Sequence, residues 1–197
     1  MKRTLISVLL ASAVGLASVA ASAGTVVVNG STTVLPAMQK ISENFMKKHS
    51  DIKVSISGGG SGHGIKALMD KTTDVAMSSR DIKPAEAENV KKSGGEAVRF
   101  VVAIDAIVPV VHPKNAVKDL TLDQIRDIYA GRITNWKQVG GADARITVVS
   151  RDSSSGTFET WESLVMKGER VQQRALLQAS NGAVLQTVAK NPNAIGY

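Results

Sequence analysis

The chain has 197 residues, of which 43% are hydrophobic and 21% charged, and its formal net charge is +7. This composition is typical of a globular protein and too apolar for a disordered one. The absence of cysteine excludes disulfides, thiolate metal sites and a cysteine nucleophile. Three histidines without metal-binding spacing disfavour a histidine metal site, and an aromatic content of 4% disfavours stacking platforms for nucleic acids or sugars.

Residues 1–23 are predicted to be a secretory signal peptide. Lys2 and Arg3 precede an uncharged apolar run, which is followed by an A-x-A cleavage site at 21–23. The run is too short and too rich in alanine and serine for a membrane anchor. We expect a mature chain that begins at Gly24 in the periplasm, with a net charge of +5 because the leader removes two basic residues. Since the remaining basic residues are spread along the chain, no nucleic-acid partner is expected.

Three strand–turn–helix units are predicted in the first half of the mature chain. In each unit a β-branched or alternating strand leads through a turn rich in glycine or hydroxyl side chains into apolar residues at helical spacing. The strands are predicted at 25–28, 52–56 and 74–77, the turns at 30–35, 57–64 and 78–80, and the helices at 36–46, 65–69 and 84–92. Such alternation implies βαβ units, whose ligands bind at the carboxyl ends of the strands, where these turns lie.

The second half of the mature chain repeats this pattern less regularly. An apolar run at 100–111 carries one charge, Asp105, and predicts two strands or one strand that crosses between lobes. The other predicted elements are a helix at 120–129 with Thr121 as its N-cap, a strand at 145–150, a hydroxyl-rich turn at 151–157, a helix from Phe158, two helical pieces within 169–190 joined near 180–182, and the start of a strand at 193–197.

Four turns have the position and composition of an anion site. A helix N-terminus presents free N–H groups and a partial positive charge. The turns are 30–35, 57–64, 78–80 and 151–157. One such turn usually contains only an N-cap hydroxyl, whereas four that converge would surround an oxyanion. Arg80 and Arg151 could add bidentate recognition of a tetrahedral oxyanion.

The sequence lacks the motifs of the enzymes that could use these residues. The glycine run contains neither GxxxxGK[ST] nor GxGxxG. Ser61 is not in a GxSxG elbow, because His63 stands two residues after it. Ser154 and Ser155 have no identifiable base nearby in sequence. An exported serine hydrolase or phosphatase and a surface adhesion protein are the alternatives from other functional classes.

Six segments occur in the order of a known family. They are 30–34 (GSTTV), 58–65 (GGGSGHGI), 74–80 (DVAMSSR), the apolar strand with Asp105, 133–136 (ITNW) and 151–157 (RDSSSGT). Together they resemble the substrate-binding proteins of phosphate ABC transporters, in the type II periplasmic-binding-protein superfamily. The resemblance implies an α/β fold of two lobes, with mixed, mainly parallel sheets flanked by helices. It implies lobe 1 at 24–105, lobe 2 at 106–197, hinge crossings near 104–112 and 193–197, and a fragment that lacks the C-terminal return of lobe 1.

The resemblance further implies a binding protein that captures inorganic phosphate and delivers it to the membrane permease of an ABC importer, without catalysis. The implied phosphate ligands are Ser31, Thr33, Val34, Leu35, Ser61, Ser79, Arg80, Arg151, Ser155, Gly156 and Thr157. Some members carry an Asp where Ser79 stands, which accepts the proton of hydrogen phosphate, and here we expect Asp105 or else Asp152 in that role. Sulfate or molybdate is the alternative ligand. We expect a monomer without cofactor or metal.

Overall fold

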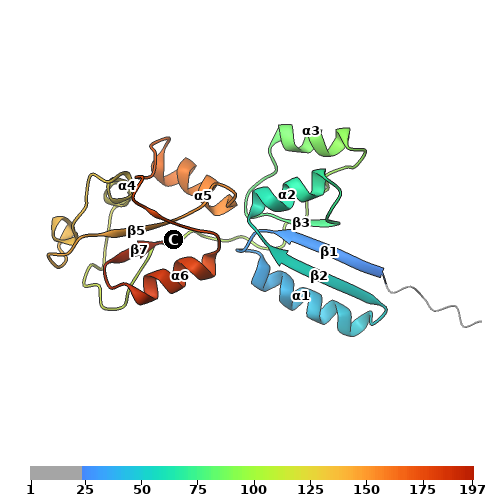
Figure 1. Ribbon diagram of the computed structural model, residues 1–197, viewed down its shortest axis with the longest axis horizontal. Coiled ribbons are helices and arrows are strands. Elements are labelled where there is room, and N and C mark those ends of the chain that lie inside the picture. The colour runs from blue at the N-terminus through green and yellow to red at the C-terminus, as the bar shows by residue number, and fades with distance from the viewer. Residues whose placement is uncertain (1–23) are drawn as a thin grey trace, which may run out of the picture.

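The computed structural model describes residues 24–197, so the predicted signal peptide lies outside the described residues. The elements form two α/β lobes that lie side by side along the long axis of the molecule (Figure 1). Below, lobe 1 denotes the elements within residues 24–92 and lobe 2 those within 110–197. The predicted fold class, with mainly parallel sheets flanked by helices, is confirmed. No helix within 24–197 combines the length and the apolar character that a bilayer crossing requires.

Lobe 1 contains a three-stranded parallel sheet in the order β2-β1-β3. Its elements are β1 (Gly24–Gly30), α1 (Leu35–Lys48), β2 (Ile52–Gly58), α2 (Ser61–Met69), β3 (Val75–Met77) and α3 (Pro84–Lys92). β1 and β2 pair from Gly24 opposite Ile52 to Gly30 opposite Gly58, and β3 pairs with the other side of β1. The three strands run in one direction, so the turns that follow them lie at one edge of the sheet.

Lobe 2 contains a four-stranded sheet in the order β4-β7-β5-β6, in which only β4 is antiparallel to its neighbour. Its elements are β4 (Val110–Val111), α4 (Leu122–Ala130), η1 (Trp136–Val139), β5 (Thr147–Arg151), α5 (Gly156–Trp161), the π-helical turn η2 (Glu162–Met166), β6 (Leu176–Gln178), α6 (Asn181–Lys190) and β7 (Ala194–Gly196). The predicted cap of α4 is confirmed, because the Thr121 hydroxyl accepts from the backbone N–H of Gln124 at 3.1 Å.

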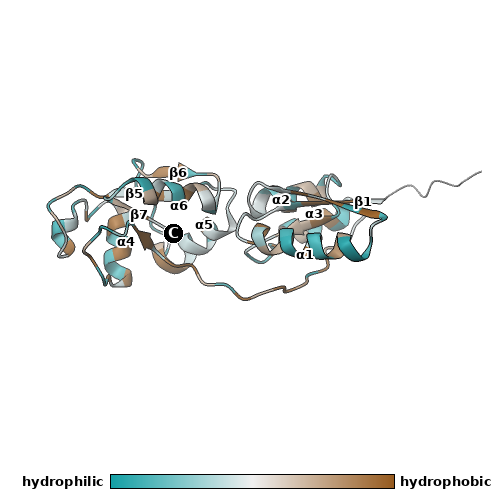
Figure 2. Ribbon diagram, turned by 90° about the horizontal axis from the view of Figure 1, so that it is seen from below, coloured by the Kyte–Doolittle hydropathy of each residue, from teal (hydrophilic) through white to brown (hydrophobic). Residues whose placement is uncertain are grey.

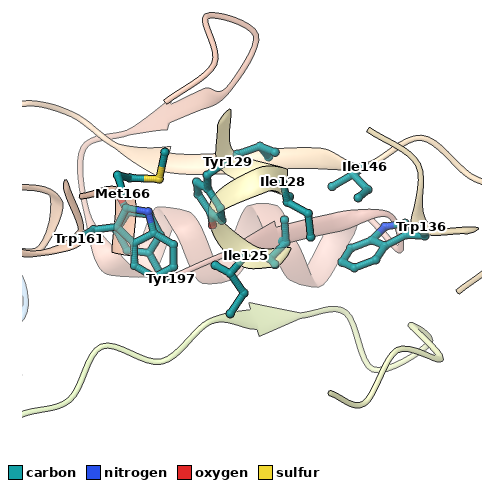
Figure 3. Packing of buried hydrophobic residues seen from close by; sticks show 10 residues of the cluster. Ile125, Ile128, Tyr129, Trp136, Ile146, Trp161, Met166 and Tyr197 are labelled. Carbon is teal, nitrogen blue, oxygen red and sulfur yellow. The ribbon is translucent and has the colours of Figure 1, made fainter. Parts of the chain in front are cut away.

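The interior of lobe 2 is a cluster of aromatic and aliphatic side chains (Figure 3). Trp161 and Tyr197 stack with their ring centroids 4.1 Å apart, and Tyr129 packs against both rings. The Tyr129 hydroxyl donates to the carbonyl of Val149 at 3.2 Å, so its buried polar atom is satisfied. The remaining members of the cluster are Ile125, Ile128, Trp136, Ile146, Val148, Met166 and Ile195. This packing fixes β5 and α5, which carry several predicted site residues.

The segment 169–178 differs from its predicted helical structure. It is a loop that leads into the short strand β6, which pairs with β5. The backbone N–H of Gln172 donates to the carbonyl of Tyr129 at 2.8 Å, and its side-chain amide donates to the carbonyl of Ile128 at 2.9 Å. These hydrogen bonds attach the loop to the C-terminal end of α4. Tertiary contacts therefore replace the hydrogen bonds that a local helix would form.

The segment 100–109 also differs from its prediction, because it forms no strand. It runs from lobe 1 to lobe 2 as extended chain (Figure 2), and strand structure begins only at β4. Phe100 is 82% exposed and Ile104 is 98% exposed. No strand within residues 24–197 pairs with this segment, so its high β propensity is not realised as a ladder.

Candidate functional site

The four predicted turns between a strand and a helix, called corners below, lie together between the two lobes. They are 30–35, 57–64, 78–80 and 151–157. Three hydrogen bonds join the corners across the interface. The backbone N–H of Gly62 donates to the carbonyl of Ser154 at 2.9 Å, and the Ser154 hydroxyl donates to the carbonyl of Gly59 at 3.1 Å. The hydroxyl oxygens of Thr33 and Thr157 lie 3.0 Å apart. The carboxyl ends of the parallel strands in both lobes thus face one cleft.

Ser61, Ser79 and Gly156 form the most closely packed part of this cleft. The fully buried Ser61 hydroxyl accepts from the backbone N–H of Ser79 at 3.0 Å and lies 3.2 Å from the Ser79 hydroxyl. A Cβ atom at Gly156 would overlap the Ser61 hydroxyl and would lie 2.9 Å from that of Ser79. Only glycine therefore lets the first turn of α5 approach both hydroxyls.

Ser31 and Ser155 shape their corners from within. The buried Ser31 hydroxyl accepts from the backbone N–H groups of Thr33 at 3.2 Å and Val34 at 3.4 Å. The Leu35 N–H donates to the Ser31 carbonyl at 3.1 Å. The Ser155 hydroxyl caps α5 by accepting from the backbone N–H of Phe158 at 3.2 Å. The three amides predicted as ligands at 33–35 are thus satisfied inside their own turn.

Arg151, at the end of β5, is a buried cation without a counter-ion. Its side chain donates to the carbonyls of Gln178 at 3.0 Å and Ala179 at 3.1 Å, and to the side-chain oxygen of Asn181. None of the ion pairs within residues 24–197 includes it. Burial lowers the pKa of this guanidinium, and the carboxylate of the neighbouring Asp152 offsets part of that effect without forming an ion pair. A desolvated charge held only by neutral acceptors favours the entry of an anion.

Asn181 belongs to this site although the sequence did not single it out as a ligand. Its side-chain N–H donates to the Thr33 hydroxyl at 3.0 Å, and its backbone N–H donates to the Thr32 hydroxyl at 3.4 Å. Ser180 before it is the N-cap of α6 and accepts from the backbone N–H of Ala183 at 3.1 Å. The corner between β6 and α6 is therefore a fifth strand–turn–helix corner. The prediction of helix at 169–178 concealed it, although the Ser-Asn-Gly signal was present.

Arg80 has a different environment from Arg151. Two of its N–H groups donate to the carboxylate oxygens of Glu86, each at 2.8 Å, and Nε donates to Glu159 at 2.9 Å. A further N–H donates to the carbonyl of Asp81 at 2.8 Å, so four of the five guanidinium N–H groups are engaged. The hydrogen bonds with Glu86 raise the pKa of Arg80. This cation is already neutralised, which leaves little of it for a ligand.

The two candidate proton acceptors occupy different places. Asp105 lies on the exposed segment between the lobes, and its carboxylate accepts from the backbone N–H of Ala106 at 2.8 Å. It lines a cavity of about 560 Å³ that is also lined by Thr33, Ser79 and Thr157. Asp152 accepts from the backbone N–H of Ser154 at 2.9 Å, and its carboxylate lies 2.5 Å from the Ser154 hydroxyl, whose single proton it shares with the Gly59 carbonyl. Asp152 thus stabilises the 151–157 corner, whereas Asp105 borders the open part of the cleft.

The side chains around the cleft are mostly hydroxyls. Within residues 24–197, the hydrogen-bond partners of the Ser61, Ser79 and Ser155 hydroxyls are backbone N–H groups and one another, and none is a histidine. In the same part of the chain, no three His, Cys, Asp or Glu side chains gather in a way that could hold a metal ion. Hydroxyls, helix ends and one uncompensated cation can bind an oxyanion of high charge density.

Comparison with known proteins extends this picture. Residues 16–197 match the family model described as a PBP superfamily domain. The phosphate-binding protein PstS of Staphylococcus epidermidis is 35% identical over 171 residues, which cover 85% of this chain and 52% of the relative. That of Borreliella burgdorferi is 33% identical over 177 residues, which cover 86% of this chain and 61% of the relative. The chain thus spans little more than half the length of these curated relatives.

Solved structures show the same similarity in three dimensions. A substrate-binding protein from Clostridium perfringens, solved with bound phosphate, is 41% identical with a TM-score of 0.80, over 88% of this chain and 70% of that chain. An ABC-type phosphate transport receptor from Vibrio cholerae is 36% identical with a TM-score of 0.63, over 87% of this chain and 69% of that chain.

Proposed function

This chain belongs to the PBP superfamily and, within it, to the family of substrate-binding proteins of phosphate ABC transporters, and we propose that it captures inorganic phosphate between its lobes. The observation that carries this proposal is Arg151, a cation that is 1% exposed and has no carboxylate partner. A tetrahedral dianion in the cleft would supply the missing counter-charge. The hydroxyls and helix ends around it would supply hydrogen-bond donors.

The proposed ligands come from both lobes. Four hydroxyls form two hydrogen-bonded pairs, Thr33 with Thr157 at 3.0 Å and Ser61 with Ser79 at 3.2 Å. Each hydroxyl can donate to a ligand in place of its present partner. The N-terminus of α5 adds the amides of Gly156 and Thr157. Asp105 is a further proposed ligand. The other predicted residues are proposed to act on the site indirectly: Ser31 and Ser155 hold their turns, the satisfied amides of Val34 and Leu35 belong to the first of these turns, and Arg80 joins the lobes.

The proposed biological role is capture and delivery without catalysis. After removal of residues 1–23, an extracytoplasmic and monomeric protein would pass phosphate to the membrane permease of an ABC importer. We propose lobe 1 at 24–105 and lobe 2 at 106–197, with hinge crossings near 104–112 and 193–197 that open the cleft. The TM-score of 0.80 to a structure with bound phosphate supports this role.

The proton of hydrogen phosphate offers a way to select phosphate over sulfate. A carboxylate acceptor favours a ligand that still holds a proton and repels one that does not. Asp105 borders the same cavity as Ser79 and Thr157 and is the proposed acceptor. Replacement of Asp105 by asparagine should therefore narrow the difference between phosphate and sulfate affinity.

Calorimetric titration with phosphate and with sulfate at two pH values tests the proposal. The informative variant is Asn181→Asp, because it places a carboxylate against Arg151 and supplies the missing counter-charge from within. We expect about 100-fold weaker phosphate binding without loss of folded protein. Asn115→Asp in lobe 2 is the matched control, since Asn115 has the same charge change and only holds the N–H of Val117. Unchanged affinity in Asn181→Asp would contradict the assigned site, and turnover of a chromogenic phosphate ester would instead support a hydrolase.

A further inference from the structure

Two ion pairs connect the lobes directly. Glu159 on α5 of lobe 2 lies between two cations of lobe 1. One carboxylate oxygen is 2.9 Å from Nε of Arg80, and the other is 2.6 Å from Nζ of Lys83. No other ion pair within residues 24–197 joins an element of lobe 1 to an element of lobe 2.

On the lobe-1 side of this contact Arg80 is fixed and shielded, whereas the Lys83 side chain is 57% exposed. The Arg80 side chain is only 8% exposed, and its two hydrogen bonds to Glu86 fix the guanidinium plane. Glu86 also accepts from the backbone N–H of Lys83 at 2.8 Å, which ties the start of α3 to the same network. The Glu159 side chain is 23% exposed. Ion pairs that are shielded and geometrically fixed are screened less than exposed pairs and lose less conformational entropy.

The four charges also cancel. Arg80 and Lys83 are matched by Glu86 and Glu159, so the network adds no net charge to the cleft. Arg151, which is held only by neutral hydrogen-bond acceptors, is then the cation of the cleft that remains available to an anion. Arg80 and Arg151 thus have separate tasks, one between the lobes and one toward the ligand.

The sequence places this network next to ligand residues on both sides of the cleft. Arg80 directly follows Ser79, and Glu159 stands two residues after Thr157 on the same helix. When Glu159 contacts Arg80 and Lys83, the first turn of α5 lies against Ser61 and Ser79. We infer that Glu159 is a positioning residue that latches the lobes in the closed state and thereby slows ligand release, although it contacts no ligand. This inference rests on the proposed function for the identity of the ligand.

The test compares Glu159→Gln with Glu43→Gln. Glu43 pairs only with Lys40 within α1, at 3.4 Å, so it has the same charge change without contact to lobe 2. We expect Glu159→Gln to release radiolabelled phosphate about 5–10-fold faster, with little change in the association rate. The dissociation constant should rise by the same factor, and Glu43→Gln should behave like the unmodified protein. Equal release rates in all three proteins would overturn the latch.

A second measurement does not depend on phosphate. Because the chain has no cysteine, Lys47→Cys and Lys190→Cys can carry a pair of spin labels, one in each lobe. In the ligand-free protein, Glu159→Gln should lengthen and broaden the distance distribution between the labels. Lys83→Gln should act less than additively with Glu159→Gln, because both remove one contact. Identical distributions would overturn the latch, whereas a failure of the unmodified protein to bind phosphate would overturn the proposed function alone.

Discussion

Lobe 1 and lobe 2 present similar corners to one cleft but have different interiors. Lobe 2 is built around ten buried side chains that include two tryptophans and two tyrosines. In lobe 1 the buried apolar side chains are Val28, Ile65, Met77 and Val90. Ile41 and Phe45 of α1 remain 50% and 38% exposed. Apolar packing therefore fixes lobe 2, whereas polar networks contribute a larger share of the order in lobe 1.

Arg151 of lobe 2 and Arg80 of lobe 1 differ in the same way as the interiors of their lobes. Arg151 projects from the strand that the lobe-2 core immobilises, and its charge has no acidic partner. Arg80 lies in the lobe-1 turn and is held by two carboxylates, one from each lobe. A well-packed interior can thus hold a charge in readiness for a ligand. In lobe 1, which has the smaller interior, Arg80 instead stabilises its own lobe through Glu86 and the contact with lobe 2 through Glu159.

The largest expected effect comes from a cavity in lobe 2. Ile128→Ala should destabilise the protein by about 2–5 kcal/mol, because Ile128 is fully buried in the ten-residue cluster. Ile65→Ala in lobe 1 should fall near the lower end of that range, since fewer buried neighbours surround Ile65. Urea denaturation followed by far-UV circular dichroism measures both. An equal or larger cost for Ile65→Ala would contradict the difference between the interiors.

Gly156→Ala tests how closely the lobes must approach. The added methyl group would overlap the Ser61 hydroxyl, so the affinity for phosphate should fall by about 10–100-fold. Gly182→Ala in α6 is the control, because its Cβ would meet only the Ser180 hydroxyl at 3.9 Å. Calorimetry decides the comparison. Full affinity in Gly156→Ala would show that the cleft tolerates a wider separation than the structure indicates.

The smallest expected effect is a difference in pH dependence between the lobes. Arg80 lowers the pKa of Glu86, so this stabilisation is present above the unfolded pKa of about 4.3 and is lost as the pH falls through the folded value. Burial raises the pKa of Tyr129 and of Tyr197. In the unfolded chain these phenols ionise near pH 10, so lobe 2 should lose stability as the pH rises above about 10.

Thermal unfolding at acid, neutral and alkaline pH measures this difference. Glu86→Gln should reduce the fall in Tm between neutral and acid pH by roughly 5 °C. The fall in Tm between neutral and alkaline pH should stay unchanged. Tyr197→Phe should reduce the alkaline fall in Tm instead, at the cost of the hydrogen bond between Tyr197 and Ser150. The assignment fails if both variants change the same fall in Tm.

Most of the fold was predictable because its signals are local. Each unit of lobe 1 has a strand, a turn and an amphipathic helix within about 25 residues, and Thr121 and Gln124 identify the start of α4. The strand β6 was not predictable, because its three residues become a strand only through pairing with β5. The apolar run at 100–109 has the composition of a strand, but no described strand pairs with it.

The sequence predicted which turns form the site, but it did not predict which of the two arginines is neutralised by a carboxylate. Both Arg80 and Arg151 follow a strand and precede a helix, so the sequence assigns them the same role. Glu86, which stands six residues after Arg80, is a nearby partner, but the partners that place each arginine in the cleft are distant: Glu159 stands 79 residues after Arg80 and Asn181 stands 30 residues after Arg151. Ion pairing between lobes depends on tertiary structure and has no local signal.

The aromatic cluster of lobe 2 also determines which part of the protein intrinsic fluorescence can monitor. Both tryptophans of the chain, Trp136 and Trp161, lie in lobe 2, and Trp161 stacks on Tyr197. Intrinsic tryptophan emission therefore monitors the folding of lobe 2, because lobe 1 contains no tryptophan. A denaturation curve recorded by emission would miss an earlier loss of lobe 1.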